Sequence, residues 1–267
     1  MAEPQKQIAK VLRIWTTVMS NVRMRDRTVK ILQYGSQMLL GYWGAALSRQ
    51  GREALGLLQR SSSSSRKAFW MLKSITNMAT AMQQWEDGYF SAASTLVQKL
   101  DAIENLFLVW YYWCETKTYF ARAKLFGLTE KAIDYYTNLS WALGDTAYFA
   151  AAALRLVENS SRRRELGDLI AHRRHIYTAE TLDNLQNELD CLQAAKGRLH
   201  SNFVIGILEL AVSLEYAGFY RFMTGHNLYK TYIGACGVCS SALIIHNGVL
   251  DALAVEDARK PPENKVD

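Results

Sequence analysis

Proline is missing from almost the whole chain, and this absence constrains the fold more than any other feature. The three prolines are Pro4, Pro261 and Pro262, so none occurs between Gln5 and Lys260. Average usage of about 5 % would place roughly a dozen there. Because a proline costs about 3 kcal/mol inside a helix, such a chain fits a protein that is helical nearly throughout. The predicted fold class is all-α.

Hydrophobic periodicity divides the chain into helices and short connections. We expect helices at about 5–30, 31–58, 66–84, 90–126, 129–158, 162–199, 202–224 and 231–252. Along the chain we expect six segments. The first three are basic N-terminal helices (1–60), a serine hinge with an amphipathic helix (61–90) and central helices (91–160). They are followed by a polar, basic and leucine-heptad helix (161–200), a C-terminal membrane segment (201–252) and a polar tail (253–267). The hinge is the run Ser61 to Ser65.

The segment from Arg66 to Gln83 has the pattern of an amphipathic helix. At about 100° per residue, one arc of about 120° collects its apolar side chains. They are Ala68, Met71, Leu72, Ile75, Met78, Ala79 and Met82. The opposite side carries the cations Arg66, Lys67 and Lys73 and no acid, which is typical of helices that lie in a membrane interface. A surface helix that packs on a protein core is the alternative.

Charge is distributed unevenly along the chain. Residues 1–80 contain 13 lysines and arginines against Glu3, Asp26 and Glu53, a net +10, whereas the whole chain has +6. A basic N-terminal third favours an anionic partner, either nucleic acid or an anionic leaflet. Its cations alternate with long apolar faces, and no nucleic-acid-binding motif is present. We therefore expect an anionic phospholipid membrane as partner and no nucleic acid.

One stretch is long enough to cross a membrane. Thr231 to Leu250 contains 20 residues without a formal charge, and a span needs about 20 apolar residues. Gly234, Gly237, Ser240 and Ser241 form a small-residue surface that could let another helix approach closely. The sequence therefore predicts a membrane anchor that also serves self-association, with a buried helix of a soluble bundle as the alternative.

A heptad-like row of leucines follows the basic stretch at 160–175. Leu182, Leu185, Leu189, Leu192 and Leu199 have the spacing of a helix–helix seam. Because the row is short, an intramolecular hairpin is at least as good an interpretation as a coiled-coil dimer.

Motifs for catalysis and metal binding are absent from the sequence. It has no G-x-S-x-G, H-E-x-x-H, Walker-type or dinucleotide glycine pattern. Cys236 and Cys239 form a lone C-x-x-C without further ligands for zinc. We expect no enzyme, no metal and no cofactor.

Three motifs carry a resemblance to a known family. Arg25-Asp26-Arg27, followed by KILQYGS at 30–36, resembles the N-terminal RDK-x-x-R-x-x-QYGS pattern of the peroxin eleven family of peroxisomal membrane proteins. Residues 65–69 with Leu72-Lys73 resemble that family's next helix, and GACGVCSS at 234–241 resembles its glycine-rich C-terminal membrane segment. The three matches follow the family's order and extend over most of the chain.

The resemblance implies a protein of the peroxisomal membrane, a location that includes specialised peroxisomes such as glycosomes. It also implies membrane elongation before fission, insertion of an amphipathic helix into the cytosolic leaflet, and self-association. The implied protein partners are the import receptor for peroxisomal membrane proteins and the fission machinery, a dynamin-related GTPase and its adaptor. Two other functions stay open: a metabolite pore lined by Asp145, Glu209 and Glu215, and a soluble helical adaptor built on the leucine row.

Overall fold

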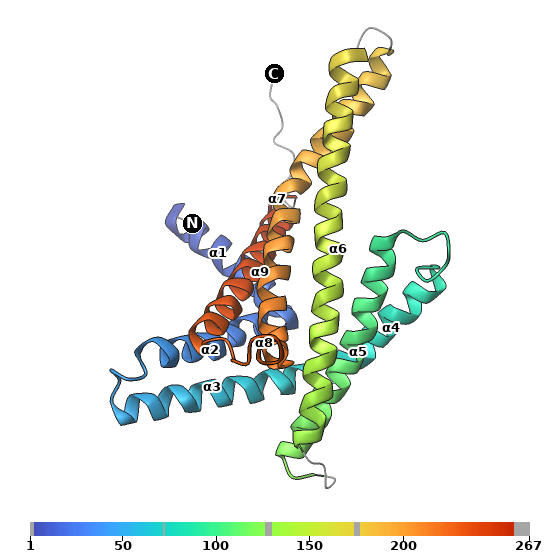
Figure 1. Ribbon diagram of the computed structural model, residues 1–267. Helices are drawn as coiled ribbons and strands as arrows, with labels where there is room; N and C mark the ends of the chain where they lie inside the picture. Colours follow the sequence, from blue (N-terminus) through green and yellow to red (C-terminus); the bar gives the residue numbers. More distant parts are fainter. Residues whose placement is uncertain (1–2, 72, 126–129, 174–176, 259–267) are drawn as a thin grey trace. The chain divides into compact units, whose positions relative to one another are not determined.

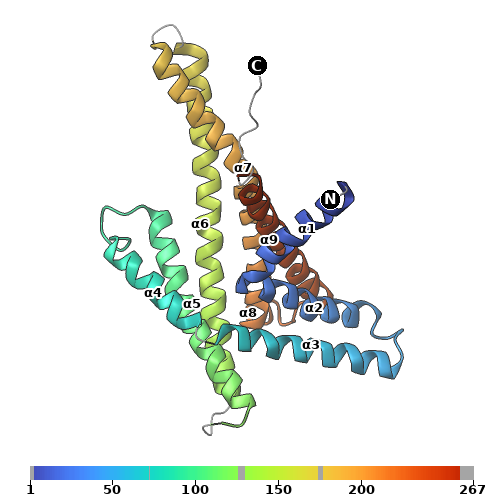
Figure 2. The same cartoon turned by 180° about the vertical axis from the view of Figure 1, so that it is seen from behind.

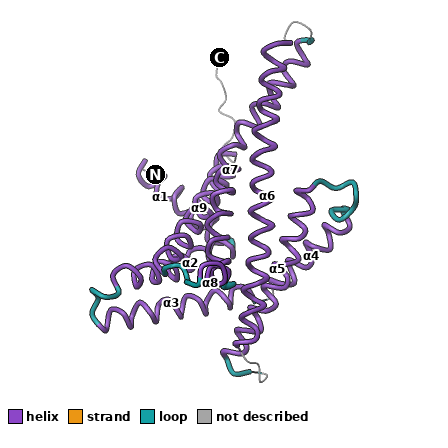
Figure 3. The backbone as a smooth tube through the Cα atoms, viewed as in Figure 1, coloured by secondary structure: helices purple, strands orange, loops and turns teal. Residues whose placement is uncertain are grey.

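All regular structure in the described part of the chain is helical. We obtained a computed structural model that describes residues 3–71, 73–125, 130–173 and 177–258 (Figures 1 and 3). The helices are α1 (Glu3–Ser20), α2 (Val22–Trp43), α3 (Arg49–Trp70), α4 (Lys73–Glu86), α5 (Leu96–Arg122), α6 (Glu130–Arg173), α7 (Ala179–Tyr216), α8 (Phe219–Thr224) and α9 (Lys230–Ala258). The all-α prediction is confirmed.

The helices belong to two compact units. The terminal unit comprises Met1–Met71 and Tyr220–Asp267, and the central unit comprises Leu72–Phe219. The boundary between them falls inside the helix that the sequence predicts at 66–84. That expected amphipathic helix is therefore shared between two units.

In the terminal unit, α2 packs against both α3 and α9. It runs antiparallel to α3, because Asp26 contacts Arg66 near the end of α3 and Gln37 contacts Gln59 one or two turns earlier. It also runs antiparallel to α9, and α1 joins α9 through an ion pair of 2.9 Å between Arg13 and Glu256. The core of this unit is therefore organised around α2 (Figure 2).

The central unit is a row of antiparallel helices in chain order. Asn105 of α5 donates a hydrogen bond of 3.0 Å to Gln84 of α4, and Arg155 of α6 pairs with Asp101 of α5. The two longest helices, α6 and α7, lie side by side in both views (Figures 1 and 2). Asn159 of α6 donates to the carbonyl oxygen of Leu192 of α7 at 3.1 Å.

Capping side chains mark several helix starts. Asn21 accepts a hydrogen bond from the backbone of Arg23 and begins α2, so the helix expected at 5–30 is two helices. Ser48 caps α3 in the same way, and the helix expected at 31–58 is interrupted before it. Thr95 forms a capping box with Gln98 at the start of α5. Each cap satisfies backbone donors that the first helical turn leaves open.

The predicted serine hinge is wrong. Ser61 to Ser65 are helical and lie inside α3, with Ser62 buried. The helix ends instead at Trp70, where Met71 takes an extended conformation with φ −54° and ψ 130°. Serine is only a moderately poor helix former, and the contacts that Arg66 makes on α2 hold this end of α3 in place.

The leucine row forms an intramolecular hairpin. Leu182, Leu185, Leu189 and Leu192 are half-buried in α7, which packs along α6. At the other end of the chain, α9 extends to Ala258, so the expected tail at 253–267 begins as helix, and the rest of it lies outside the described residues.

Candidate membrane-binding site

The helix α4 turns polar side chains toward its neighbour in the central unit. The Nζ atom of Lys73 donates a hydrogen bond of 2.7 Å to the hydroxyl of Tyr112 on α5 and lies 4.4 Å from the centre of that ring. One end of α4 is tied by Lys73 and the other by the hydrogen bond between Gln84 and Asn105. Ala81 is the buried apolar residue of this face. The contact with α5 therefore uses the more polar side of α4.

The apolar side of α4 faces outward. Ile75, Met78 and Met82 are 62 %, 55 % and 60 % exposed, and Ala79 is also exposed. Trp85 follows on the same side with 70 % exposure. A helix that served a water-soluble core would bury this side. A contiguous exposed patch of large apolar side chains marks a surface that binds a membrane or a partner.

The seven side chains predicted to form one membrane-inserting face do not share one helix. Ala68 belongs to α3, Met71 is the residue at which α3 ends, and Leu72 lies outside the described residues. Ile75, Met78, Ala79 and Met82 belong to α4. Because the extended conformation of Met71 interrupts the helix, the rotational phase that aligned all seven is lost. The apolar face of α4 therefore comprises the last four residues and Trp85.

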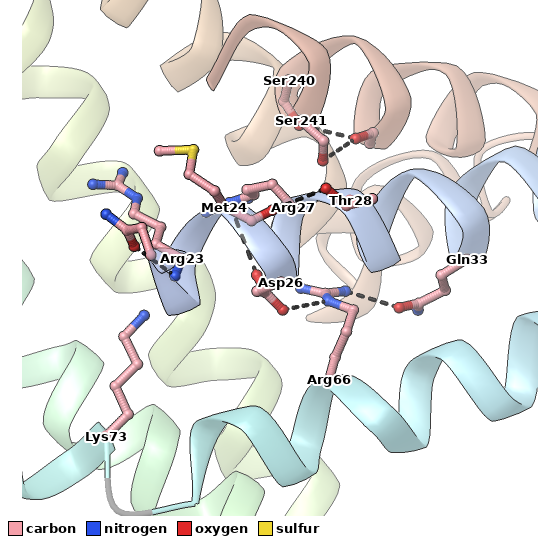
Figure 4. Close-up of polar contacts among 12 residues, drawn as sticks. Arg23, Met24, Asp26, Arg27, Thr28, Gln33, Arg66, Lys73, Ser240 and Ser241 are labelled. Atoms are coloured by element: carbon pink, nitrogen blue, oxygen red, sulfur yellow. Dashed lines mark hydrogen bonds and ion pairs between the residues drawn. The ribbon is translucent and has the colours of Figure 1, made fainter. Parts of the chain in front are cut away.

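Arg66 is buried, although the sequence predicts that it contacts lipid headgroups. Its Nε donates to the carboxylate of Asp26 at 2.9 Å and its Nη1 to Gln33 at 2.8 Å (Figure 4). Its guanidinium also lies 4.5 Å from the centre of the Trp70 ring. In this conformation Arg66 cannot reach a headgroup, because its donors are used within the terminal unit.

Lys67 is also buried in the terminal unit, whereas Lys73 is only partly buried. The amphipathic pattern placed all three cations on a solvated face because it could not account for packing against α2. A signal was nevertheless present: Asp26 is one of three acids among the first 80 residues, and such an acid inside a basic segment favours an internal ion pair.

Among the described residues, α9 is the one helix long and apolar enough to cross a membrane. Only 28 % of its most apolar stretch is buried, so much of the surface of α9 is uncovered. Tyr229 and Tyr232 are strongly exposed at its start, on either side of Lys230. Exposed tyrosines and a lysine at a helix end are typical of the interface between membrane and water.

The small-residue surface of α9 is occupied by α2 of the same chain. A Cβ atom added to Gly237 would lie 2.4 Å from the Tyr34 ring, and one added to Gly234 would lie 2.7 Å from Met38. Ser240 and Ser241 are fully buried, and the hydroxyl of Ser241 donates to the carbonyl of Gly237 at 2.7 Å (Figure 4). A helix does approach closely here, as the small residues suggest, but it belongs to this chain.

The terminal unit buries many polar side chains beside its apolar ones and exposes many large apolar side chains. Its buried polar side chains are Asp26, Lys30, Gln33, Ser36, Gln37, Ser62, Arg66, Lys67, Ser240, Ser241 and Asn247. Its exposed large apolar side chains include Ile8, Val11, Leu12, Trp15, Leu32, Tyr42, Trp43, Leu57 and Leu250. Water-soluble proteins show the opposite tendency. In membrane proteins polar side chains face the bundle interior.

No group of three or more histidine, cysteine, aspartate and glutamate side chains in the described ranges could hold a metal ion. Burial raises the pKa of the Cys114 thiol. A thiol with a raised pKa is less reactive, since the thiolate is the nucleophile.

An outward apolar helix, buried polar side chains beneath an apolar surface and a candidate span define a helical membrane protein. The family model Peroxisomal biogenesis factor 11 (PEX11) matches residues 12–248, and the chain belongs to this family. No curated protein and no solved structure gives a significant match.

Membership places the protein in the peroxisomal membrane and implies a role in peroxisome proliferation and elongation. Proteins of this family are membrane-remodelling peroxins and not enzymes. The soluble adaptor is therefore wrong as an interpretation, and the leucine row on which it was based packs against α6.

Proposed function

We propose that α4 inserts into the cytosolic leaflet of the peroxisomal membrane and that the inserted volume elongates the organelle. The observation that carries this proposal is the orientation of α4, with Lys73 and Gln84 toward α5 and with Ile75, Met78 and Met82 outward. A wedge in one leaflet expands that leaflet and favours curvature. On its other side α4 packs against α5, which holds it in place within the central unit.

Burial of apolar surface supplies most of the binding energy. Each large side chain contributes about 1.5–3 kcal/mol if it leaves water completely. Ile75, Met78, Met82 and Trp85 together outweigh the single cation Lys73, since attraction to an anionic surface is worth about 1 kcal/mol per lysine. Insertion is therefore expected to depend weakly on salt and strongly on the apolar face.

The headgroup role predicted for Arg66 and Lys67 requires a conformational change. Both residues would have to leave the interior of the terminal unit, and Arg66 would have to separate from Asp26 and Gln33. Lys73 needs a smaller change: it lies on α4 itself and is only partly buried, but its Nζ would have to leave the Tyr112 hydroxyl on α5. We therefore assign headgroup attraction to Lys73 only after it separates from Tyr112.

We assign membrane anchoring to α9, with Tyr229, Lys230 and Tyr232 at the interface. Self-association would concentrate the wedges, but the stripe formed by Gly234, Gly237, Ser240 and Ser241 is unsuited to it while α2 covers the two glycines and the two serines are buried. Contacts with the import receptor and with the fission GTPase and its adaptor rest on family membership alone. For the pore there is less support, since Glu209 is buried in α7.

The test uses the purified full chain and vesicles that contain anionic phospholipid. The double variant Ile75→Glu with Met82→Glu places two charges on the outward face and should abolish tubulation. The matched control is Thr76→Glu with Thr80→Glu, which adds the same charge at exposed polar positions of α4 that lie outside both its apolar face and its contact with α5. Tubulation by the first variant, or its loss in the control alone, would rule out α4 as the wedge.

A further inference from the structure

Two apolar grooves lie on either side of α5 in the central unit. The groove between α5 and α6 has a volume of about 470 Å³ and is lined by Ile103, Leu106, Phe107, Trp110, Tyr136, Leu139, Ser140 and Leu143. The groove between α4 and α5 has a volume of about 330 Å³ and is lined by Met78, Ala81, Met82, Trp85, Glu86, Phe90, Leu106 and Val109. Leu106 belongs to both linings. The outward face of α4 therefore continues across α5 to α6.

The groove between α5 and α6 offers little to a polar ligand. None of its lining residues carries a formal charge. The Ser140 hydroxyl already donates within α6, to the backbone carbonyl of Tyr136 at 2.7 Å or of Thr137 at 3.0 Å. Trp110 and Tyr136 are more than half exposed and lie at the rim. The chemistry of this groove suits a hydrocarbon with a polar group near the rim.

Polarity along α5 points to lipid as the occupant. Glu115 and Thr118 are buried in the interior of the unit, whereas Leu106, Trp110 and Trp113 are exposed. The Nζ atom of Lys117 lies 5.2 Å from the centre of the Trp113 ring, which places a cation beside the aromatic row. Tryptophan, tyrosine and lysine together are typical of the interface between a bilayer and water. The chain also belongs to a family of the peroxisomal membrane, so phospholipid is the medium beside it.

We propose that the groove between α5 and α6 binds an acyl chain of a bilayer phospholipid, with Trp110 and Tyr136 at the level of the headgroup. This proposal rests on the proposed insertion of α4, because that insertion brings the adjoining groove to the hydrocarbon boundary. An acyl chain in this groove buries apolar side chains that α4 alone leaves exposed. The central unit then contacts the leaflet through α4, α5 and α6.

Quenching of tryptophan fluorescence by phospholipids brominated on their acyl chains tests the proposal. Three single-tryptophan forms of the full chain retain Trp110, Trp85 or Trp141, with the other tryptophans replaced by phenylalanine. Trp110 should lose at least half of its fluorescence on brominated vesicles relative to unbrominated ones. Trp141 should change little, because its ring lies between those of Tyr111 and Tyr216, 5.8 Å from each.

The Trp85 form separates the two proposals. Quenching of Trp85 without quenching of Trp110 overturns the groove and leaves the insertion of α4 intact. If neither is quenched in vesicle-bound protein, both proposals fail.

A second measurement needs no tryptophan replacement. Phospholipid with a photoreactive acyl chain should label peptides that contain 103–110 and 136–143 in the wild-type chain. Leu139→Glu places a carboxylate in the groove and should lower labelling of 103–110 at least fivefold, while labelling of α4 persists. Tyr135→Glu, an exposed position outside the lining, is the matched control and should leave labelling unchanged. If a second copy of the chain covers the groove instead, both peptides will be protected from labelling whatever the lipid content of the sample. That result would overturn the proposal.

Discussion

The Nε atom of Arg66 donates a hydrogen bond of 2.9 Å to the carboxylate of Asp26, from which it is separated by 40 positions in the chain. Both side chains are buried, so this ion pair joins α3 to α2 inside the terminal unit. It also removes one of the three predicted headgroup-binding cations from the surface.

Asp26→Ala should destabilise the protein by about 3–5 kcal/mol, because it leaves the Arg66 charge buried without its carboxylate. Asp26→Leu with Arg66→Leu should recover most of that loss, since an apolar pair of similar volume avoids the desolvation of two charges. Chemical unfolding of the purified protein in detergent measures both. Glu53→Ala is the control: its pair with Arg49 is exposed, so the change should stay below about 1 kcal/mol. If Asp26→Ala and Glu53→Ala lower the free energy of unfolding equally, the pair between Asp26 and Arg66 is not buried.

Gly237→Ala should destabilise the terminal unit, although alanine favours helices by about 1 kcal/mol over glycine. The reason is steric, because the new Cβ would lie 2.4 Å from the ring of Tyr34 and α2 would have to move. Gly56→Ala is the matched control, since apart from the neighbouring backbone of α3 no atom lies within 4 Å of the added Cβ and the site is helical. Thermal unfolding in detergent should give a lower midpoint for the first variant and a higher one for the second. A raised midpoint for Gly237→Ala would show that α2 does not pack on this part of α9.

Ser63→Pro distinguishes a helical serine tract from a hinge. Inside α3 a proline removes a backbone hydrogen bond and clashes with the preceding turn, at a cost of about 3 kcal/mol. A hinge would accept the substitution with little change. Ser64→Ala should leave stability equal or slightly raised, because alanine is the better helix former at an exposed position. Circular dichroism and unfolding of both variants measure the difference.

The pair between Arg162 and Glu188 connects α6 to α7 at 2.8 Å on an exposed surface. The hydrogen bond from Arg162 holds the pKa of the Glu188 carboxyl below its ordinary value. A carboxyl with a lowered pKa stabilises the fold fully above its unfolded pKa, about 4.3, and that stabilisation is lost as the pH falls through the lowered value. Glu188→Gln should therefore speed amide exchange nearby at pH 6, and this effect should disappear once the pH has fallen through the lowered pKa of Glu188. The change in amide exchange should be small, because the pair is exposed. If the change persists unchanged at low pH, it results from altered packing and not from the loss of the carboxylate charge.

Several features could be predicted from the sequence because they depend on local chemistry. The absence of proline indicates helices throughout, and the uncharged run at 231–250 predicts the helix that became α9. Capping residues such as Asn21 and Ser48 were also visible, although the periodicity alone extended the helices across them. The family motifs at 25–36 and 234–241 lie in α2 and α9, which pack against each other.

The candidate site was predicted only in part. Ile75, Met78, Ala79 and Met82 do share an outward face, but Ala68 and Met71 belong to the terminal unit. Periodicity assigns an angle to each residue on the assumption that the helix continues. It cannot detect that Met71 interrupts the helix, because nothing in its side chain forbids the helical conformation.

By itself the sequence determined that the chain is helical, which of its segments are amphipathic or apolar enough for a membrane, and the family to which it belongs. Only the tertiary structure decided which side of each helix is covered. Arg66 is buried because Asp26 and Gln33 lie opposite it on α2, and the α4 methionines are exposed because α5 takes the polar side instead. Burial depends on partners distant in the chain, and a local pattern contains no information about them.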